Sequence, residues 1–252
     1  MQRAITTMRE CGTVQEFESF ACDHAGFALE GLVAKPAGAG PFPAVLVMHS
    51  ANGLRHQVQE TIGRLAQLGY LAVATDMYGP AIQQGDAEGT GLAYMSFHEN
   101  PALLRERVVA WFDAVAARPD VDTARIAAIG YCFGGWCVLE LARSGADVKA
   151  VVSYHGILTT HAPARAGEVD CEVAAYCGAL DPYAPVDTID GLRRELTDAG
   201  VRYNVSVFGA AAHSFTDPNA ASMGMPGIEY DAIADKVSWA GTLALLEATI
   251  GG

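Results

Sequence analysis

The sequence has few basic residues for its length. Its 252 residues include 16 Lys and Arg against 29 Asp and Glu, which gives a formal net charge of −13. Nucleic acids and anionic membrane surfaces are bound through basic patches, so we expect neither as a partner. Long apolar runs are also missing, since none approaches the roughly 20 residues of a membrane span. The first residues lack the apolar segment and cleavage site of a signal peptide. A small molecule is therefore the expected partner.

Cysteine is present, but the patterns that bind metals or form disulfide frameworks are absent. The six cysteines include no C-x-x-C pair, and no group of Cys and His has zinc spacing. We therefore expect no metal and no other cofactor. A chain this long can build a large core, so it does not need disulfides. We predict a reducing, cytoplasmic setting in which five of the six thiols are small apolar core residues.

Internal repeats, low-complexity tracts and Pro- or Ser-rich linkers are missing as well. This favours one domain over residues 14–252, preceded by an N-terminal tail at 1–13. The segments "FPAVLVMHS" and "YLAVATDMYG" are almost continuously apolar, as expected for strands buried on both faces. Such runs alternate with helical patterns along the chain. The alternation predicts an α/β fold with a mostly parallel sheet of about eight strands and helices on both faces.

Helices and pattern-free stretches can be placed within this scheme. Helical patterns cover residues 55–68 and 100–118, and a long final helix is predicted over 228–249. No clear pattern covers residues 79–99 or 157–170. Loops of that length in a compact domain are often functional, and the first could form a lid.

One cysteine differs from the others in its surroundings. The segment "GYCFGG" places Cys132 between glycines, where a strand runs into a helix. The spacing G-x-C-x-G-G is that of a nucleophile elbow with cysteine in place of serine. The alternative is a strand-to-helix turn that holds an inert buried cysteine.

A nucleophile on an elbow needs a base, and the base needs an acid to orient it. In α/β-hydrolases the chain order is nucleophile, acid, histidine. "GALDPYAP" ends a strand at Asp181, and "AAAHSF" places His213 after the next strand. Parallel strands share a direction, so both residues are expected at one sheet edge. Asp before Pro is also a common turn starter, and His213 could be an ordinary loop histidine. Three other acids compete for the orienting role: Asp76, Asp187 and Asp217.

These motifs, together with "HSANGLRHQVQETIGRLAQLGYLAVATDMYG", resemble the dienelactone hydrolase family of α/β-hydrolases over residues 14–250. The resemblance implies the α/β-hydrolase fold. It also implies that Cys132, His213 and Asp181 act as nucleophile, base and orienting acid. An oxyanion hole would be formed by two backbone N–H groups, those of Phe133 and Ala51.

The sequence departs from the family pattern in two places. The family's glutamate after the third strand is replaced by Ser50, and the adjacent His49 could shape the oxyanion loop, act as a second base or be a plain buried histidine. The arginines that hold a carboxylated lactone in the family are also missing. Residues 77–104 contain no Lys or Arg, and the residue that follows shortly after His213 is the acidic Asp217. A carboxylate without a cationic partner binds poorly, so a neutral substrate is predicted.

Aromatic and apolar side chains replace the missing cations. The predicted substrate pocket contains His49, Ser50, Tyr78, Tyr94, Phe97 and Trp136, with Leu92 and Met95 nearby. The alternative is that the apolar members belong to the core. The sequence predicts a monomeric or small homo-oligomeric hydrolase that uses a cysteine nucleophile on neutral aryl or short acyl esters or lactones. A promiscuous phosphotriesterase on the same triad and a ligand-binding protein without turnover remain open, and a redox thiol is the weaker alternative.

Overall fold

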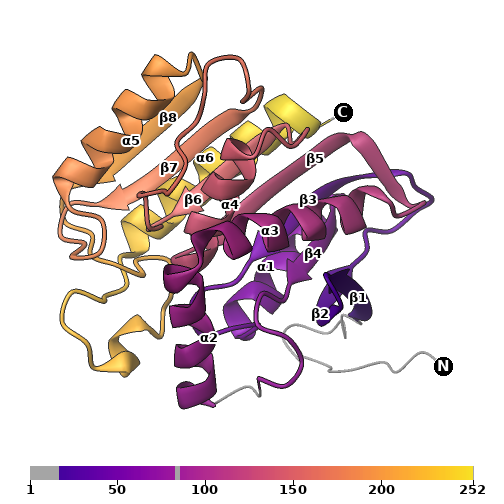
Figure 1. Cartoon of the computed structure of the whole chain (residues 1–252), viewed down its shortest axis with the longest axis horizontal. Coiled ribbons are helices and arrows are strands. Elements are labelled where there is room, and N and C mark those ends of the chain that lie inside the picture. The colour runs from indigo at the N-terminus through magenta and orange to yellow at the C-terminus, as the bar shows by residue number, and fades with distance from the viewer. Residues whose placement is uncertain (1–16, 83–85, 252) are drawn as a thin grey trace.

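The computed structural model describes residues 17–82 and 86–251, so the tail predicted over 1–13 lies outside the described residues. Its centre is an eight-stranded sheet in the order β1-β2-β4-β3-β5-β6-β7-β8 (Figure 1). The strands are β1 (Glu18–His24), β2 (Phe27–Ala34), β3 (Phe42–Met48), β4 (Leu71–Thr75), β5 (Val121–Tyr131), β6 (Ala150–Tyr154), β7 (Glu172–Gly178) and β8 (Tyr203–Phe208). Only the pairs β1–β2 and β2–β4 are antiparallel in the sheet. The predicted mostly parallel sheet of about eight strands is confirmed.

Strand register brings the carboxyl ends of the central strands to one edge. Met48 of β3 is the partner of Gly130 in β5, and Tyr131 of β5 is the partner of Tyr154 in β6. Tyr154 in turn pairs with Tyr176 in β7. Residues that follow these strands are therefore neighbours in space, although they are far apart in the sequence.

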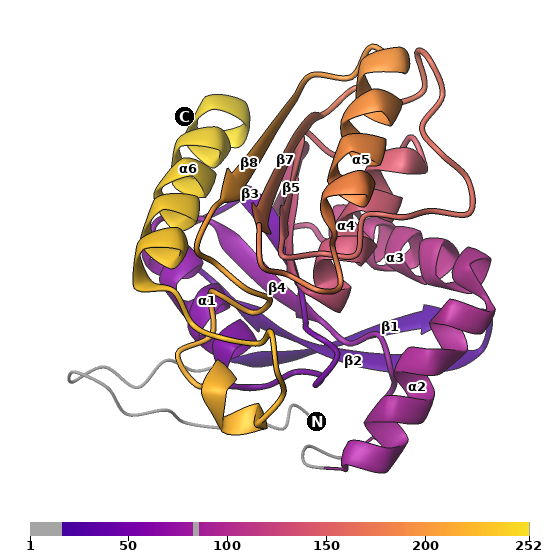
Figure 2. The ribbon, with the colours of Figure 1, turned by 90° about the vertical axis from the view of Figure 1, so that its left-hand side faces the viewer.

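Two layers of helices cover the sheet (Figure 2). The helices are α1 (His56–Gln67), α2 (Ala87–Glu99), α3 (Pro101–Ala116), α4 (Phe133–Arg143), α5 (Val186–Asp198) and α6 (Ala232–Ile250). The apolar faces of α1 and α6 pack on one side of the sheet, and those of α3, α4 and α5 pack on the other. The predicted helices at 55–68 and 100–118 match α1 and α3 to within two residues. Within residues 17–82 and 86–251, no helix is long and apolar enough to cross a membrane.

Two expectations about helices were wrong. Residues 79–99 contain α2, whose side-chain cap is Asp86 and whose sequence includes two glycines. Glycine is a poor helix former, and the apolar residues of α2 do not gather on one face, so the helical pattern is weak. The last helix begins at Ala232 and not at residue 228, because Asp231 caps it by accepting from two backbone N–H groups.

A buried ion network fixes the loop between β6 and β7. Glu140 of α4 is fully buried and bonds both Arg105 of α3, at 2.8 Å, and Arg143, at 2.9 Å. Each arginine also donates to a loop carbonyl, Arg105 to Ala162 at 2.6 Å and Arg143 to Leu158 at 2.9 Å. The loop contains no helix or strand, as predicted, but these bonds tie it to the helix layer.

Candidate active site

The turn from β5 to α4 places a cysteine in an unusual backbone conformation. Cys132 has φ 54° and ψ −111°, in the left-handed half of backbone space where residues other than glycine are rare. A Cβ on Gly130 would clash with the carbonyl of Gly134, and a Cβ on Gly134 would clash with the carbonyl of Met48. The glycines of the G-x-C-x-G-G pattern are therefore required by close backbone approach, as an elbow demands.

Asp181 and His213 lie in contact at the sheet edge. Asp181 follows β7 and His213 follows β8, and Oδ2 of the acid lies 2.8 Å from Nδ1 of the imidazole. The other carboxylate oxygen accepts from the backbone N–H of Tyr183 at 2.8 Å, which fixes the acid's orientation. The histidine backbone is held by Gly227 and Glu229 at 2.9 and 3.0 Å. Both side chains are buried, so the remaining nitrogen, Nε2, has a fixed direction.

That nitrogen faces the thiol, and the two groups change each other's pKa. Burial works to raise the pKa of Cys132, but the charge and hydrogen bond of His213, with the N–H groups of Ala51 and Phe133, bring it below its ordinary value. Burial works to lower the pKa of His213, but the charge of Cys132 and the bonds to Asp181 and Cys132 raise it to about 10. Both shifts act in the direction that favours a thiolate paired with an imidazolium.

The two backbone amides predicted for an oxyanion hole affect the Cys132 thiol. The N–H groups of Ala51 and Phe133 act on it as hydrogen-bond donors that lower its pKa. Phe133 is the first residue of α4, where backbone N–H groups have no partner inside the helix. Ala51 follows β3 in a turn closed by the bond from the Gly53 N–H to the Ser50 carbonyl, at 3.1 Å. A carbonyl bonded to the sulfur would place its oxygen between these donors, and this role stays a prediction.

The three competing acids lie elsewhere. The carboxylate of Asp76 accepts from two backbone N–H groups that follow it, that of Tyr78 at 2.9 Å and that of Gly79, which reaches both oxygens at 3.0 Å. Asp187 is exposed in the first turn of α5, and Asp217 accepts from a backbone N–H of its own turn at 2.9 Å. Among the acids in the described part of the chain, Asp181 is the one that bonds His213.

His49 has no free ring nitrogen. It is fully buried, and its Nε2 accepts from the backbone N–H of Met77 at 3.0 Å. Its Nδ1 lies 2.6 Å from the carbonyl of Ser50, so Nδ1 carries the proton and donates it there. Burial also lowers the pKa of His49. These bonds fit the role of shaping the oxyanion loop and leave no lone pair for a second base.

The predicted aromatic pocket is mostly closed. Tyr78, Phe97 and Trp136 are 5%, 1% and 4% exposed, and the rings of Tyr78 and Phe97 stack at 6.3 Å. Tyr94 of α2 is partly exposed and lies close enough for the charge of Cys132 to affect it; burial first and this charge second raise its pKa to about 12. Tyr94 therefore offers surface near the thiol, whereas the three buried rings form the wall behind it. Their part in substrate binding stays a prediction.

A third histidine at this edge, beside His49 and His213, was missed in the sequence analysis. His155 directly follows β6, in "SYHG", and its ring lies 5.1 Å from that of His213. The signal was available, because polar residues at carboxyl ends of strands had already identified Asp181 and His213. His155 has φ 40°, and Ser214 next to the base has φ 58°. Three of the four non-glycine residues with positive φ in the described ranges thus gather here, the third being Cys132.

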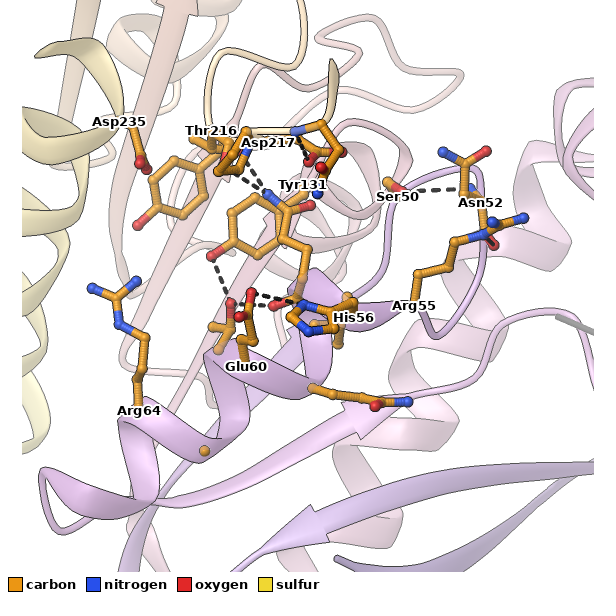
Figure 3. Close-up of a pocket in the computed structure, with 18 of the residues that line it drawn as sticks. Ser50, Asn52, Arg55, His56, Glu60, Arg64, Tyr131, Thr216, Asp217 and Asp235 are labelled. Carbon is orange, nitrogen blue, oxygen red and sulfur yellow. Dashed lines mark hydrogen bonds and ion pairs between the residues drawn. The ribbon is translucent and has the colours of Figure 1, made fainter. Parts of the chain in front are cut away.

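A cavity of about 1230 Å³ lies beside the site, between α1 and the loop after His213. Its lining includes three acids and three basic side chains: Glu60, Asp217, Asp235, Arg55, His56 and Arg64. In Figure 3, Ser50, Asn52 and Arg55 lie at one end, and Arg64 and Asp235 lie at the other. Of the predicted pocket residues, Ser50 lines this space. The open volume next to the oxyanion loop is therefore lined by charged side chains of both signs.

Metal ligands are not clustered anywhere in the described ranges. No group of three or more His, Cys, Asp or Glu side chains within residues 17–82 and 86–251 could hold a metal ion. The chemistry available to the site, as far as the structure describes it, is that of a thiol, an imidazole, a carboxylate and two backbone amides.

Comparisons with known proteins agree with this geometry. The model of the dienelactone hydrolase family matches residues 29–250. A solved structure described as m3DLH is 33% identical, with a TM-score of 0.86 and coverage of 93% of this chain and 98% of that chain. A dienelactone hydrolase-like promiscuous phosphotriesterase, P91 from metagenomic libraries, is 36% identical, with a TM-score of 0.84 and coverage of 93% and 99%. An uncharacterized protein of Caenorhabditis elegans is 35% identical over 147 residues, which are 57% of this chain and 92% of that protein.

Proposed function

Since this chain belongs to the dienelactone hydrolase family, and is therefore a hydrolase of ester bonds, we propose that it cleaves neutral esters or lactones with Cys132 as nucleophile. His213 is the base and Asp181 its orienting acid. The observation that carries the proposal is the convergence of one bonded imidazole and two backbone N–H groups on a single sulfur. A ligand-binding protein has no need of that convergence.

In the first half of the proposed reaction the Cys132 thiolate attacks the ester carbonyl carbon. The oxyanion that forms accepts hydrogen bonds from the N–H groups of Ala51 and Phe133. When the intermediate collapses, the carbon–oxygen bond to the leaving alcohol breaks, and that oxygen takes the proton of His213 Nε2. The products of this half are a free alcohol, a thioester on Cys132 and a neutral imidazole.

In the second half the neutral imidazole activates water. His213 Nε2 takes a proton from the water, and the hydroxide oxygen attacks the thioester carbonyl. The bond to sulfur then breaks, the carboxylic acid leaves, and the thiolate and imidazolium are restored. Asp181 holds Nδ1 throughout, so that Nε2 is the nitrogen that exchanges protons.

The substrate is proposed to be uncharged. No Lys or Arg side chain occurs between Met77 and Leu104, and after His213 the sequence has Asp217 and no Lys or Arg before Lys236. The cavity beside the site has basic and acidic side chains in equal number. Tyr94 is a partly exposed aromatic side chain close enough to the thiol for its charge to act on it, which suits an aryl or short acyl group.

Phosphotriester cleavage is a second candidate. The observation that favours it is the 36% identity, over 93% of this chain, to a protein described as a promiscuous phosphotriesterase. A phosphotriester is also neutral, and the same two amides would hold its phosphoryl oxygen. A screen that crosses aryl esters, lactones and aryl phosphotriesters with one common leaving group separates the two reaction centres.

The first prediction tests the nucleophile. Brief treatment with iodoacetamide at neutral pH should alkylate Cys132 before the other described thiols, because it is the one that is both partly exposed and shifted to lower pKa. Activity should fall in step with that modification, as followed by peptide mapping. Cys132→Ala should remove turnover of p-nitrophenyl esters, while Cys132→Ser could keep a small part of it. Fast labelling of Cys11 or Cys22 with activity retained would refute the assignment.

A further inference from the structure

His155 is a buried, titratable side chain that the proposed reaction does not use. It is 2% exposed and lies directly after β6, with its backbone N–H donating to the Tyr176 carbonyl at 2.8 Å. Its backbone has φ 40°, a conformation that costs free energy in any residue except glycine. Side chains kept in such positions are held by their surroundings, and they cluster at functional sites. The contacts of His155 therefore need an explanation.

A hydrogen-bond chain sets the protonation state of His155. Gln57 Nε2 lies 3.1 Å from the carbonyl of Thr216 and 3.0 Å from its hydroxyl. A carbonyl only accepts, so the amide N–H₂ of Gln57 must face Thr216, and its second proton goes to the hydroxyl. The Thr216 hydroxyl is then free to donate to His155 Nε2, which lies 2.9 Å away. His155 is thus a neutral ring with its proton on Nδ1.

The same ring touches the base. The ring centroid of His155 lies 5.1 Å from that of His213, with the planes at 67°, and 5.1 Å from that of Phe215. The titratable groups that face it are His213 and, at 6.3 Å, Tyr131 of β5. Burial and then the charge of His213 lower the pKa of His155 far below its ordinary value, so it does not compete for the proton of the base. Its Nδ1 has no acceptor among the described residues.

We propose that His155 is a positioning residue: the Gln57–Thr216–His155 chain holds a neutral ring against His213 and thereby keeps Nε2 of the base directed at the Cys132 sulfur. The proposal rests on the function assigned to Cys132 and His213 above. Asp181 holds Nδ1 of the base through one bond, and the imidazole ring is packed between two others, those of Tyr183 at 4.7 Å and His155 at 5.1 Å. His155 restricts the tilt of the imidazole from its side. Thr216, which lines the polar cavity, connects this support to α1 (Figure 3).

The test removes one hydroxyl while keeping the shape of the side chain. Thr216→Val deletes the donor to His155, and His155→Phe keeps a ring but deletes the acceptor. In both variants the loosened base should stabilise the thiolate less. The midpoint of thiolate formation, measured by ultraviolet absorbance of the free enzyme against a Cys132→Ser blank, should rise by about half to one pH unit. Below that midpoint, kcat/KM should fall about 3- to 10-fold.

Two further variants separate positioning from general packing. Thr216→Ser keeps the hydroxyl and should restore the wild-type midpoint. Thr90→Val removes another buried threonine hydroxyl, one that donates to the Asp86 carbonyl at the start of α2 at 2.5 Å, and should leave the midpoint unchanged even if the protein is less stable. The melting temperature of each variant is measured alongside, and if Thr216→Val does not fold, His155→Phe and Thr216→Ser decide.

The proposal is overturned if the midpoint stays the same in Thr216→Val or His155→Phe, or if Thr216→Ser behaves like Thr216→Val. Failure of the underlying function has a different signature. In that case the absorbance signal of Cys132, which is the difference between the wild-type protein and the Cys132→Ser blank, would have the midpoint of an ordinary thiol. Alternatively, Cys132→Ala would retain turnover.

Discussion

Five cysteines lie in the described ranges, and their surroundings give them different chemistry. Burial raises the pKa of Cys22, Cys137, Cys171 and Cys177, in the last two to about 12. These thiols stay protonated and act as small apolar side chains. Cys132 is partly exposed, and His213 and two backbone N–H groups outweigh the effect of burial on its pKa. The proposed nucleophile therefore differs from the inert thiols in its three neighbouring groups as well as in its exposure.

The charged pair predicts a bell-shaped dependence of activity on pH. On the acid side, the thiolate is lost as the pH falls through the lowered pKa of Cys132. On the alkaline side, His213 loses its proton near its pKa of about 10 and cannot protonate the leaving alcohol. An aliphatic ester followed by pH-stat is the proper substrate, because its alkoxide needs that proton.

In His213→Ala the acid limb should move to higher pH, since only the N–H groups of Ala51 and Phe133 then oppose the effect of burial on the thiol. A wild-type rate that instead rises steadily into the alkaline range, as for an isolated thiol, would contradict the ion pair. The two limbs belong to the coupled pair and not to either residue alone.

His213 and Asp181 should behave as one unit. Alanine at either position is expected to lower kcat by about 10² to 10⁴-fold, and the double variant should be little worse than the poorer single one. Asp187→Ala is the matched control, because this acid is exposed and does not contact the base. Multiplying losses in the double variant would mean that Asp181 only stabilises the turn.

The β5–α4 elbow is an element in which backbone packing decides what the sequence can contain. Gly134→Ala should lower the free energy of unfolding by about 1 to 3 kcal/mol, because its Cβ would meet the carbonyl of Met48 at the end of β3. Gly191→Ala in α5 is the control: nothing lies within 4 Å of the added methyl group, and alanine favours the helix. Denaturant unfolding measures both. Equal effects of the two substitutions would show that the close approach at the elbow does not matter.

Strands and their ends were the elements best predicted from sequence. Continuous apolar runs identified the buried strands, and the rule about carboxyl ends placed Asp181 and His213 at one edge. The same rule applied to His155, but its role depends on Thr216 and Gln57, which come from distant parts of the chain. Pattern reasoning also failed for α2, where glycines hide the helix. Tertiary packing decides whether an aromatic side chain is buried behind the site or exposed in it. The residues of the substrate pocket could therefore not be assigned from the sequence.

The charge of the whole molecule bears on which substrates it accepts. A net charge of −13 repels anions at long range, and Asp217 adds a local negative charge at the cavity. Neutral aryl esters should therefore have kcat/KM values about 10²-fold or more above those of carboxylated lactones with matched leaving groups, since two charge-assisted bonds are missing. Added salt screens only the long-range part of this difference.

Asp217→Arg should raise kcat/KM for the carboxylated substrate about 10-fold or more, while Asp217→Asn, which removes charge without adding a cation, should have a much smaller effect. If the native enzyme already prefers the carboxylated lactone, then the neutral-substrate assignment is wrong. Arg55, which shares the cavity with Ser50, would then be the cation to examine.

The left-handed backbone at Cys132 has a consequence for how this protein evolves. Glycine would relieve the strain at this position, so a cysteine there carries a standing cost in stability. Selection for the proposed role of Cys132 in turnover would oppose that cost. In a descendant lineage that no longer needs the reaction, replacement of this cysteine by glycine would not impair function and would increase stability. Position 132 would then be among the first to change after the activity is lost.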